Sequence, residues 1–507
     1  MDPTLLAATV AFTVVCLLWA RSYIRKRHAL PLPPGPKGLP IVGNMFELGT
    51  DLVHVKHRDW SREFDSDIIS VSVFGETTVV LNSIEAITDL LDKRGSNYSD
   101  RPNMVMIMDL MGWDWSFSLM RYGQKWREYR RVFQHYFNVI SEHRPIQLTV
   151  SDDLLSRLHR DPQHFLHHLK HYTAAVILKR VYGYEIQPER DSFVELVDEA
   201  SQSTSLANLQ GAFIVEFLPT LKHIPTWFPG AGFKRQAKEW RKLARAIIEV
   251  PFAMVKQQLS EGKASPCYVT SVLEQNRETP DDAVAEDLIR GTAAVSYAAG
   301  ADTSVSALTT FVLAMVLHQD IQKRVQAELD SVLGGDRLPT FADKDDLPFL
   351  GACISEALRW IPILPLGVHH RSLVDDVYKG YFIPGGVSVI ANGWAVLHNE
   401  QVFPDPEEYK PQRFIDNPDL PDPIDNGVFG FGRRACAGRA MALDTIWIAA
   451  ARILTVFDIK RSKDADGRDI IPEIKFKPGA LIHVEDFPCD MTPRSPAHLA
   501  LLQEGHN

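Results

Sequence analysis

The pattern of apolar and polar positions predicts a chain built mostly of helices. Residues 287–318 contain no proline and are apolar on most faces, which is typical of a long buried helix. Residues 125–137 and 350–361 have the spacing of shorter helices, and Pro362 ends the second. Ile68 to Leu81 is instead rich in β-branched residues around a Gly-Glu pair, which predicts a β-hairpin. We therefore expect a mainly α fold with a small β region.

The N-terminus carries an uncharged apolar run from Thr4 to Ala20, and a basic cluster from Arg21 to Arg27 follows it. This order predicts a transmembrane signal anchor over residues 1–27. A cleaved secretory signal is the alternative, but in such a signal the basic residues precede the apolar run and a small-x-small site closes it. The positive-inside rule then places the N-terminus in the lumen and the rest of the chain in the cytosol.

Two proline-rich segments are also relevant to how the protein associates with the membrane. Residues 28–40 predict a stiff extended hinge between the anchor and a domain that spans residues 41–507. Residues 213–229 are apolar, aromatic and interrupted by prolines. An ordinary loop is one interpretation of this second segment, but in an anchored protein we expect it to dip into the membrane surface and to frame a route for lipophilic substrates.

The composition limits the classes of function and of site that the chain can have. The chain has 507 residues and a formal net charge of -10, without the basic surplus that attracts nucleic acids. Its five cysteines are scattered and form no CxxC pair, so neither a zinc site nor a disulfide framework is indicated. Four histidines at helical spacing suggest a metal site, but we interpret them as a polar helix face because no carboxylate or cysteine stands out nearby: His164, His167, His168 and His171.

One loop near the C-terminus carries candidate chemistry. Residues 429–438 read FGFGRRACAG and present Cys436 just before a predicted helix. The free N–H groups and the dipole of a helix N-terminus stabilise a thiolate. Gly432 and Gly438 leave room for a flat group to approach the backbone, and Arg434 offers a cation to a carboxylate. The loop is therefore suited to one thiolate ligand beneath a planar anionic cofactor.

A second polar cluster interrupts the long apolar helix. Residues 299–304 read AGADTS. Gly300 costs about 1 kcal/mol relative to alanine in a helix interior. The hydroxyl of Thr303 can donate to the carbonyl of Ala299 and bend the helix. Taken alone, this segment describes a mildly kinked core helix.

Two further pairs lie at helical spacing. Trp126 and Arg130 are four residues apart and share one face, and both donate hydrogen bonds but accept none, which suits a carboxylate. Glu356 and Arg359 are three residues apart among apolar neighbours. That second pair should be buried, and a buried ion pair is tolerated only when it is fully hydrogen-bonded.

The motif around Cys436 carries a family resemblance. Five residues match the F-x-x-G-x-R-x-C-x-G haem-binding signature position by position: Phe429, Gly432, Arg434, Cys436 and Gly438. The chain therefore resembles the cytochrome P450 superfamily. The resemblance implies the cytochrome P450 fold as a single large domain, although length alone would favour about three domains. It also implies haem b with Cys436 as the axial thiolate ligand of the iron.

The remaining motifs acquire roles from the same resemblance. Gly300, Asp302 and Thr303 match the segment that forms an oxygen groove and relays protons to dioxygen. Trp126, Arg130 and His370 match residues that bind the haem propionates, with His369 as the alternative to His370. Glu356 and Arg359, with Arg413 of the Pro411-to-Phe414 segment, match a structural triad that holds the cysteine loop. Residues 100–122, 364–368 and 478–481 are expected to line the substrate pocket.

These resemblances predict a microsomal haem-thiolate monooxygenase of the endoplasmic reticulum membrane. Its expected partners are NADPH-cytochrome P450 reductase, a lipophilic small molecule and the membrane, with Arg127 and Arg131 available to an acidic redox partner. The hinge, the PLGVHHR segment and residues 493–495 are similar to fungal secondary-metabolism members such as the O-methylsterigmatocystin oxidoreductase group. Two alternatives stay open, a haem-thiolate isomerase or dehydratase that needs no external electrons and a non-catalytic haem sensor.

Overall fold

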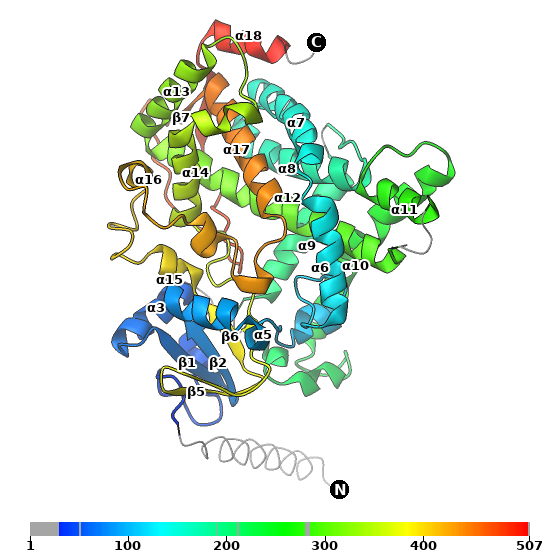
Figure 1. Ribbon diagram of the computed structural model, residues 1–507, viewed down its shortest axis with the longest axis vertical. Helices are drawn as coiled ribbons and strands as arrows, with labels where there is room; N and C mark the ends of the chain where they lie inside the picture. The colour runs from blue at the N-terminus through cyan, green and yellow to red at the C-terminus, as the bar shows by residue number, and fades with distance from the viewer. Residues whose placement is uncertain (1–29, 50–51, 189, 210–211, 279–283, 505–507) are drawn as a thin grey trace.

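A computed structural model describes residues 30–49, 52–188, 190–209, 212–278 and 284–504 (Figure 1). The predicted anchor over residues 1–27 lies outside these residues. Helices form most of the described chain, as the apolar pattern predicts. The longer helices are α3 (Val53–Glu63), α6 (Gln124–Phe137), α7 (Ile140–Arg160), α8 (Phe165–Tyr182), α9 (Ser192–Ala207), α10 (Gly232–Ser260), α11 (Tyr268–Glu278), α12 (Glu286–Leu317), α13 (Gln319–Leu333), α14 (Pro348–Trp360), α17 (Arg439–Val456) and α18 (Pro496–Glu504).

Helix α12 is the centre of the helical region and confirms the predicted long buried helix. It packs against α6, α8, α10, α14 and α17 (Figure 1). A Cβ atom on Gly300 would lie 2.7 Å from Cδ1 of Ile177 in α8, so the absence of a side chain at this position lets the two helices pack closely. Among the described residues α12 alone is long and apolar enough to cross a membrane, but most of it is buried as a core helix.

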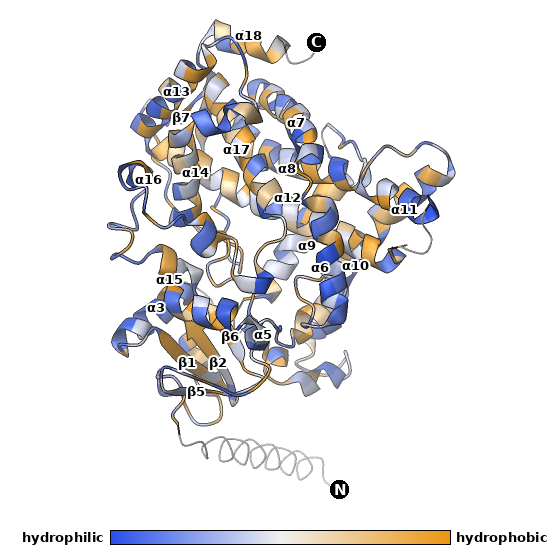
Figure 2. Ribbon diagram, in the orientation of Figure 1, coloured by the Kyte–Doolittle hydropathy of each residue, from blue (hydrophilic) through white to orange (hydrophobic). Residues whose placement is uncertain are grey.

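The four-stranded sheet lies at one end of the molecule and contains the predicted hairpin (Figure 1). Strands β1 (Ile68–Val73) and β2 (Glu76–Leu81) pair antiparallel, and they are apolar in Figure 2. The turn is made by Phe74 and Gly75, both with positive φ, one residue earlier than the Gly-Glu pair suggests. The hairpin belongs to a four-stranded sheet of order β1-β2-β6 (Ser388–Ala391)-β3 (His370–Arg371). Two further sheets have two strands each.

The other strands are short. Strand β6 (Ser388–Ala391) runs parallel to β2 and antiparallel to β3 (His370–Arg371). The two-stranded sheets consist of β4 (Asp376–Tyr378), β5 (Tyr381–Ile383), β7 (Phe457–Arg461) and β8 (Cys489–Pro493).

The described part of the predicted hinge packs along β1. Ser70 donates its side-chain hydroxyl to the Pro33 carbonyl at 2.6 Å and its backbone N–H to the Pro34 carbonyl at 2.8 Å. A Cβ atom on Gly35 would lie 1.9 Å from the carbonyl oxygen of Ser70, so only glycine permits this approach. Residues 33–35 therefore lie against β1 of the folded body, and the role of residues 28–40 as a hinge stays a prediction.

The predicted structural triad forms in the core. Glu356 and Arg359 are fully buried, and the guanidinium donates to both carboxylate oxygens at 2.7 and 3.0 Å. Arg413 in α16 (Gln412–Asp416) donates to the same carboxylate at 3.2 Å. Arg359 also donates to the carbonyls of Leu397 and Pro406. The triad therefore ties α14 to the chain that leads into the cysteine loop.

Candidate active site around Cys436

The Cys436 loop is closed by its own backbone. It follows the short helix η8 (Ile424–Val428), contains η9 (Gly432–Arg434) and leads into α17. The N–H of Cys436 donates to the carbonyl of Phe429 at 2.8 Å, and the N–H of Gly438 hydrogen-bonds the sulfur. This loop presents the thiol three residues before α17 begins, as the sequence predicts.

Gly432 and Gly438 are glycines for different physical reasons. A Cβ atom on Gly438 would meet nothing within 4 Å, so the backbone beside the thiol borders open space. A Cβ atom on Gly432 would lie 2.2 Å from the carbonyl oxygen of Leu91 in η1 (Thr88–Lys93), and Gly432 has a φ of +54°. The expectation that Gly432 makes room for a flat group is therefore corrected, because the nearby group is the backbone of Leu91.

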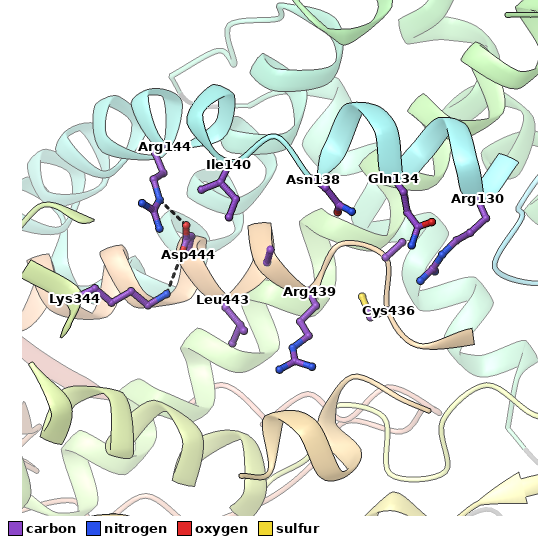
Figure 3. A pocket seen from close by; sticks show the side chains of 12 residues that line it. Arg130, Gln134, Asn138, Ile140, Arg144, Lys344, Cys436, Arg439, Leu443 and Asp444 are labelled. Atoms are coloured by element: carbon purple, nitrogen blue, oxygen red, sulfur yellow. Dashed lines mark hydrogen bonds and ion pairs between the residues drawn. The ribbon is translucent and has the colours of Figure 1, made fainter. Parts of the chain in front are cut away.

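The thiol opens into a cavity of about 420 Å³ between the cysteine loop and helices α6 and α7. Figure 3 shows Arg130 and Gln134 extending from α6 toward the loop that carries Cys436. Burial raises the pKa of the Cys436 thiol, while the N–H of Gly438 and the charges of Arg130 and Arg439 lower it. Burial is the larger effect and the net pKa of the thiol is raised, so the Gly438 N–H and the two guanidinium charges offset only part of the cost of desolvation.

Cationic side chains gather beside this loop. The guanidinium of Arg434 is buried, lies over the Trp126 ring at 4.3 Å and donates to the backbone carbonyls of Ser99 and Met120. Burial lowers the pKa of Arg434 to about 10. Arg130 is half-buried, and within the described chain it has no hydrogen bond or ion pair to a protein acceptor. The predicted residues Trp126, Arg130 and Arg434 therefore converge near Cys436.

Arg101 is a further cation of this cluster that the sequence analysis missed. It is 4% exposed and donates to the carbonyls of Ser118, Val368 and His369. Burial and the charge of Arg434 lower the pKa of Arg101 well below its usual value. Its only signal in the sequence was an arginine within the 100–122 segment predicted to line the substrate pocket.

His370 lies at the same cluster. Its Nδ1 is 2.8 Å from the carbonyl oxygen of Tyr98, and burial and the charge of Arg101 lower its pKa well below the usual value. The charge of Arg434 also lowers the pKa of His370, whereas His369 is influenced by burial, Arg101 and His57. His370 is therefore the histidine that lies beside both arginines.

The donor set fits a planar dianion with two carboxylates. Arg101 and Arg434 are buried, repel each other and use backbone carbonyls as acceptors, and Arg130 lies nearby. The acid in this cluster is Asp100, which is already bonded to Arg121 and to the N–H of Tyr122. Two carboxylates placed here would relieve the repulsion between buried cations. Beside them, Cys436 and the open space at Gly438 provide an anionic sulfur ligand and room for a flat ring.

Comparison with known proteins assigns the family. Residues 33–482 match the family described as Cytochrome P450. The chain belongs to the cytochrome P450 family. A cytochrome P450 monooxygenase of Armillaria gallica is 54% identical over 98% of both chains. A tryptamine 4-monooxygenase of Psilocybe cyanescens is 37% identical, with 95% of this chain and 96% of that protein covered. Family membership implies a haem with a cysteine thiolate ligand.

Solved structures show the same fold. A zebra fish cytochrome P450 solved with abiraterone has a TM-score of 0.70 and 23% identity, covering 87% of this chain and all of that one. A zebra fish structure with progesterone has a TM-score of 0.71. The mainly helical cytochrome P450 fold with small β sheets, in one domain, is thereby confirmed.

In this cytochrome P450, Asp302 and Thr303 lie on the open part of α12. The hydroxyl of Thr303 donates to the carbonyl of Ala299 at 2.9 Å, the bond that the sequence predicts. Because this hydrogen bond uses the hydroxyl proton of Thr303, the hydroxyl oxygen is free to accept a hydrogen bond from a water. Oδ2 of the Asp302 carboxylate is 3.4 Å from Nε2 of His483. The sequence analysis did not single out His483.

Residues next to the segments 364–368 and 478–481 contact each other, and the 100–122 segment contacts the 213–229 segment. The N–H of Ile482 donates to the carbonyl of Ile363 at 2.8 Å. The Glu216 carboxylate of η4 (Ile214–Glu216) accepts N–H bonds from Val105 and Met106 of η2 (Val105–Leu110) at 2.9 and 2.7 Å. Burial raises the pKa of Glu216 to about 7, although both N–H groups oppose the shift. Glu216 therefore joins the 100–122 segment to the 213–229 segment.

Three of the four histidines from position 164 to 171 contact protein acceptors. His164 lies 2.9 Å from the Asp161 carboxylate, and His168 bonds the carbonyl of Asp161. His171 bonds the carbonyl of Gln187. The statement that no carboxylate lies nearby was wrong, because Asp161 precedes the helix by one turn. No group of three potential ligands forms a metal site among the described residues.

Proposed function

We propose that this cytochrome P450 inserts one oxygen atom of O2 into a C–H bond of a lipophilic secondary metabolite of terpenoid or polyketide-like structure. NADPH supplies two electrons through cytochrome P450 reductase, and the second oxygen atom leaves as water. Haem b bound by Cys436 would supply the oxygen-activating chemistry. Cys436 would hold its iron, and Arg101, Arg130, Arg434, Trp126 and His370 would hold its carboxylates.

The observation that carries this proposal is the polar pair on α12. Thr303 keeps an oxygen lone pair free for a water, and Asp302 provides an acid one residue away. Reduction of O2 consumes protons, and a positioned acid and alcohol deliver them. A haem-thiolate isomerase or dehydratase consumes no external protons or electrons, and a haem sensor needs neither, so the pair favours the monooxygenase.

The test uses the reductase. The full-length protein is reconstituted with NADPH-cytochrome P450 reductase, and hydrophobic metabolites are screened for the spectral shift that follows loss of an iron-bound water. Each hit is then incubated with and without NADPH. We expect oxidised product only with NADPH, reductase and O2 together. Product formed without NADPH would support the isomerase, and binding without any product would support the sensor.

The face beneath Cys436 is suited to the reductase. Arg130, Arg144, Lys344 and Arg439 line its cavity, and the exposed Arg127 and Arg131 extend the positive surface along α6. Asp444, an acid at this cavity, is paired with Arg144 at 2.9 Å and with Lys344 at 2.8 Å (Figure 3). An acidic partner would be steered to this surface and brought within reach of the thiolate ligand.

Replacing Thr303 by alanine is expected to separate NADPH consumption from product formation. The change removes the oxygen that would hold the proton-donating water, so hydrogen peroxide should replace product. Loss of one hydroxyl and one methyl group from the open part of α12 should leave haem content and substrate affinity close to wild type. The measurement is the ratio of product to NADPH consumed, with peroxide quantified in parallel. An unchanged ratio would leave Thr303 with only a helix-bending role.

Removing residues 1–26 is expected to weaken binding to membranes without abolishing it. Trp227 is 77% exposed and Phe46 is 72% exposed. Trp227 belongs to the 213–229 segment, which borders the β1–β2 turn through the contact of Phe217 with Phe74. The segment that carries Phe46 borders the same turn, because the N–H of Phe74 donates to the carbonyl of Val42. Exposed aromatic residues on one surface favour insertion into the headgroup region. We propose this surface as a second contact with the endoplasmic reticulum membrane, with the catalytic domain in the cytosol.

Cosedimentation with phosphatidylcholine vesicles measures the effect. In the truncated protein, Trp227→Ser should release most of the remaining bound fraction. The matched control is Ile471→Ser, which removes an exposed apolar side chain from the segment after β7. Complete release of the truncated protein at low salt, before any substitution, would contradict the second contact.

A further inference from the structure

An ion pair joins the acid of α12 to a histidine far away in the sequence. Nε2 of His483 is 3.4 Å from Oδ2 of Asp302, with the two side chains 25% and 11% exposed. The carboxylate is thus enclosed, while the imidazole reaches further toward solvent. The pair lies one residue from Thr303, whose hydroxyl oxygen is free to hold a water.

The turn that carries His483 is fixed on several elements. The Ser306 hydroxyl of α12 donates to the carbonyl of Ile482, whose own N–H donates to Ile363 at 2.8 Å. On the α9 side, the N–H of Leu481 donates to the Ser205 hydroxyl at 3.0 Å. Because α12 and α9 both hydrogen-bond the backbone of this turn, the imidazole has a defined position relative to Asp302.

The other charges near this turn are engaged with one another. Lys477 on the same turn pairs with Asp486 at 2.7 Å, and both are exposed. Lys475 pairs with Glu473, and the backbone of Glu485 bonds the carbonyl of Lys475. Within the described chain, the only ion pair of Asp302 is the one with His483.

We propose that His483 is a positioning residue that holds Asp302 in place and supplies it with protons from solvent. This inference rests on the proposed monooxygenase function. In the step, the neutral imidazole, with its proton at Nε2, takes a proton at Nδ1 from solvent and becomes an imidazolium. The imidazolium then gives its Nε2 proton to the Asp302 carboxylate, which leaves the ring neutral with its proton at Nδ1. Asp302 then passes its proton toward the water held by Thr303. One proton moves inward, no other bond changes, and the electrons that consume it come from the reductase.

The presence of histidine at position 483 favours proton transfer over a role that only holds Asp302 in place. An arginine here would hold the carboxylate equally well, but it cannot release a proton. Imidazole exchanges protons at both ring nitrogens, so it can accept on its solvent side and donate on its Asp302 side. The placement of His483, with one end at an enclosed carboxylate and part of the ring exposed, matches this use.

The test compares His483→Leu, His483→Gln and Asp302→Asn in the full-length holoenzyme reconstituted with reductase. NADPH and O2 consumption are measured in H2O and D2O, so no identified metabolite is needed. We expect both His483 variants to consume NADPH about tenfold to a hundredfold more slowly than wild type, with a larger solvent isotope effect. Glutamine can still donate a hydrogen bond to Asp302 but cannot relay protons, so it should not rescue the rate.

A double variant and three readouts other than turnover exclude a purely structural effect. Asp302→Asn with His483→Leu should be no slower than Asp302→Asn alone, because His483 acts through Asp302. The variants should match wild type in haem content and in the thermal unfolding midpoint. They should also match it in the anaerobic rate of haem reduction, measured by trapping the reduced haem with carbon monoxide. Lys477→Gln, on the same turn, is the control and should leave NADPH consumption unchanged.

The possible failures are distinguishable. If wild type consumes no NADPH with the reductase, the proposed function fails. If wild type is active and His483→Gln consumes NADPH at the wild-type rate with the same isotope effect, His483 only tethers Asp302 and the relay is overturned. Additive losses in the double variant would likewise overturn it, because they would show that His483 acts independently of Asp302.

Discussion

Replacing Cys436 by alanine is expected to abolish the thiolate-bound state of the cofactor and all monooxygenase turnover. Cys436 is the one cysteine that opens into the cavity beneath α6, and the N–H of Gly438 bonds its sulfur. Alanine leaves the iron without an anionic donor, and the electron push that favours O–O cleavage is lost. The measurement is the red-shifted Soret band of the ferrous carbonyl complex in the purified protein, with product formation assayed alongside.

Cys489→Ala is the matched control for this loss. The other described cysteines, Cys267, Cys353 and Cys489, are buried, whereas Cys436 is exposed and lines the cavity. A thiol enclosed in the protein core is not accessible to the cofactor, so the Cys489 variant should keep the full red-shifted band. If Cys436→Ala kept that band at full strength, another residue would have to be the ligand and the assignment of the site would fall.

Replacing Glu356 by alanine is expected to prevent accumulation of folded, haem-loaded protein. The side chains of Glu356 and Arg359 are fully buried, and the carboxylate also accepts from Arg413 and from the N–H of Lys410 at 2.8 Å. Truncation leaves buried guanidinium groups without their counter-ion, a loss of about 3 to 5 kcal/mol in the free energy of unfolding. That loss is comparable to the total stability of many domains.

The readouts are soluble yield, haem per protein and the urea midpoint of unfolding. Glu400→Ala is the control, because it breaks an ion pair with Arg62 whose two partners are both exposed, and such pairs contribute about 0 to 1 kcal/mol. The control should fold and bind haem normally. A soluble Glu356→Ala protein with full haem content and low turnover would show that Glu356 acts in catalysis and not in folding.

Sequence reasoning worked where a motif is local. Cys436, the helix after it and the N–H donor at Gly438 lie within a few residues, so spacing alone places them together. The hydrogen bond from Thr303 to Ala299 is one helical turn long and follows from periodicity. The burial of Glu356 and Arg359 was likewise readable from the apolar residues between them.

Sequence reasoning failed where the decisive neighbour is distant. Gly432 was assigned to the cofactor side because the backbone of Leu91, which its Cβ would strike, is more than 300 residues earlier. Arg101 carried no motif, and its place beside Arg434 exists only after the segment before α6 packs on the cysteine loop. Asp161 was overlooked because it precedes the histidine helix and is not part of the stripe.

The sequence by itself determined the helical class, the hairpin and the residues that belong to each local motif, because helix and strand periodicities and the Cys436 signature are short-range properties. Only the tertiary structure decided which of these residues meet. It placed Arg101 and His370 beside Arg434, Glu216 on the 105–110 helix, and His483 on Asp302. Such contacts join residues far apart in the chain, so they depend on how the helices pack around α12, and no spacing in the sequence records that packing.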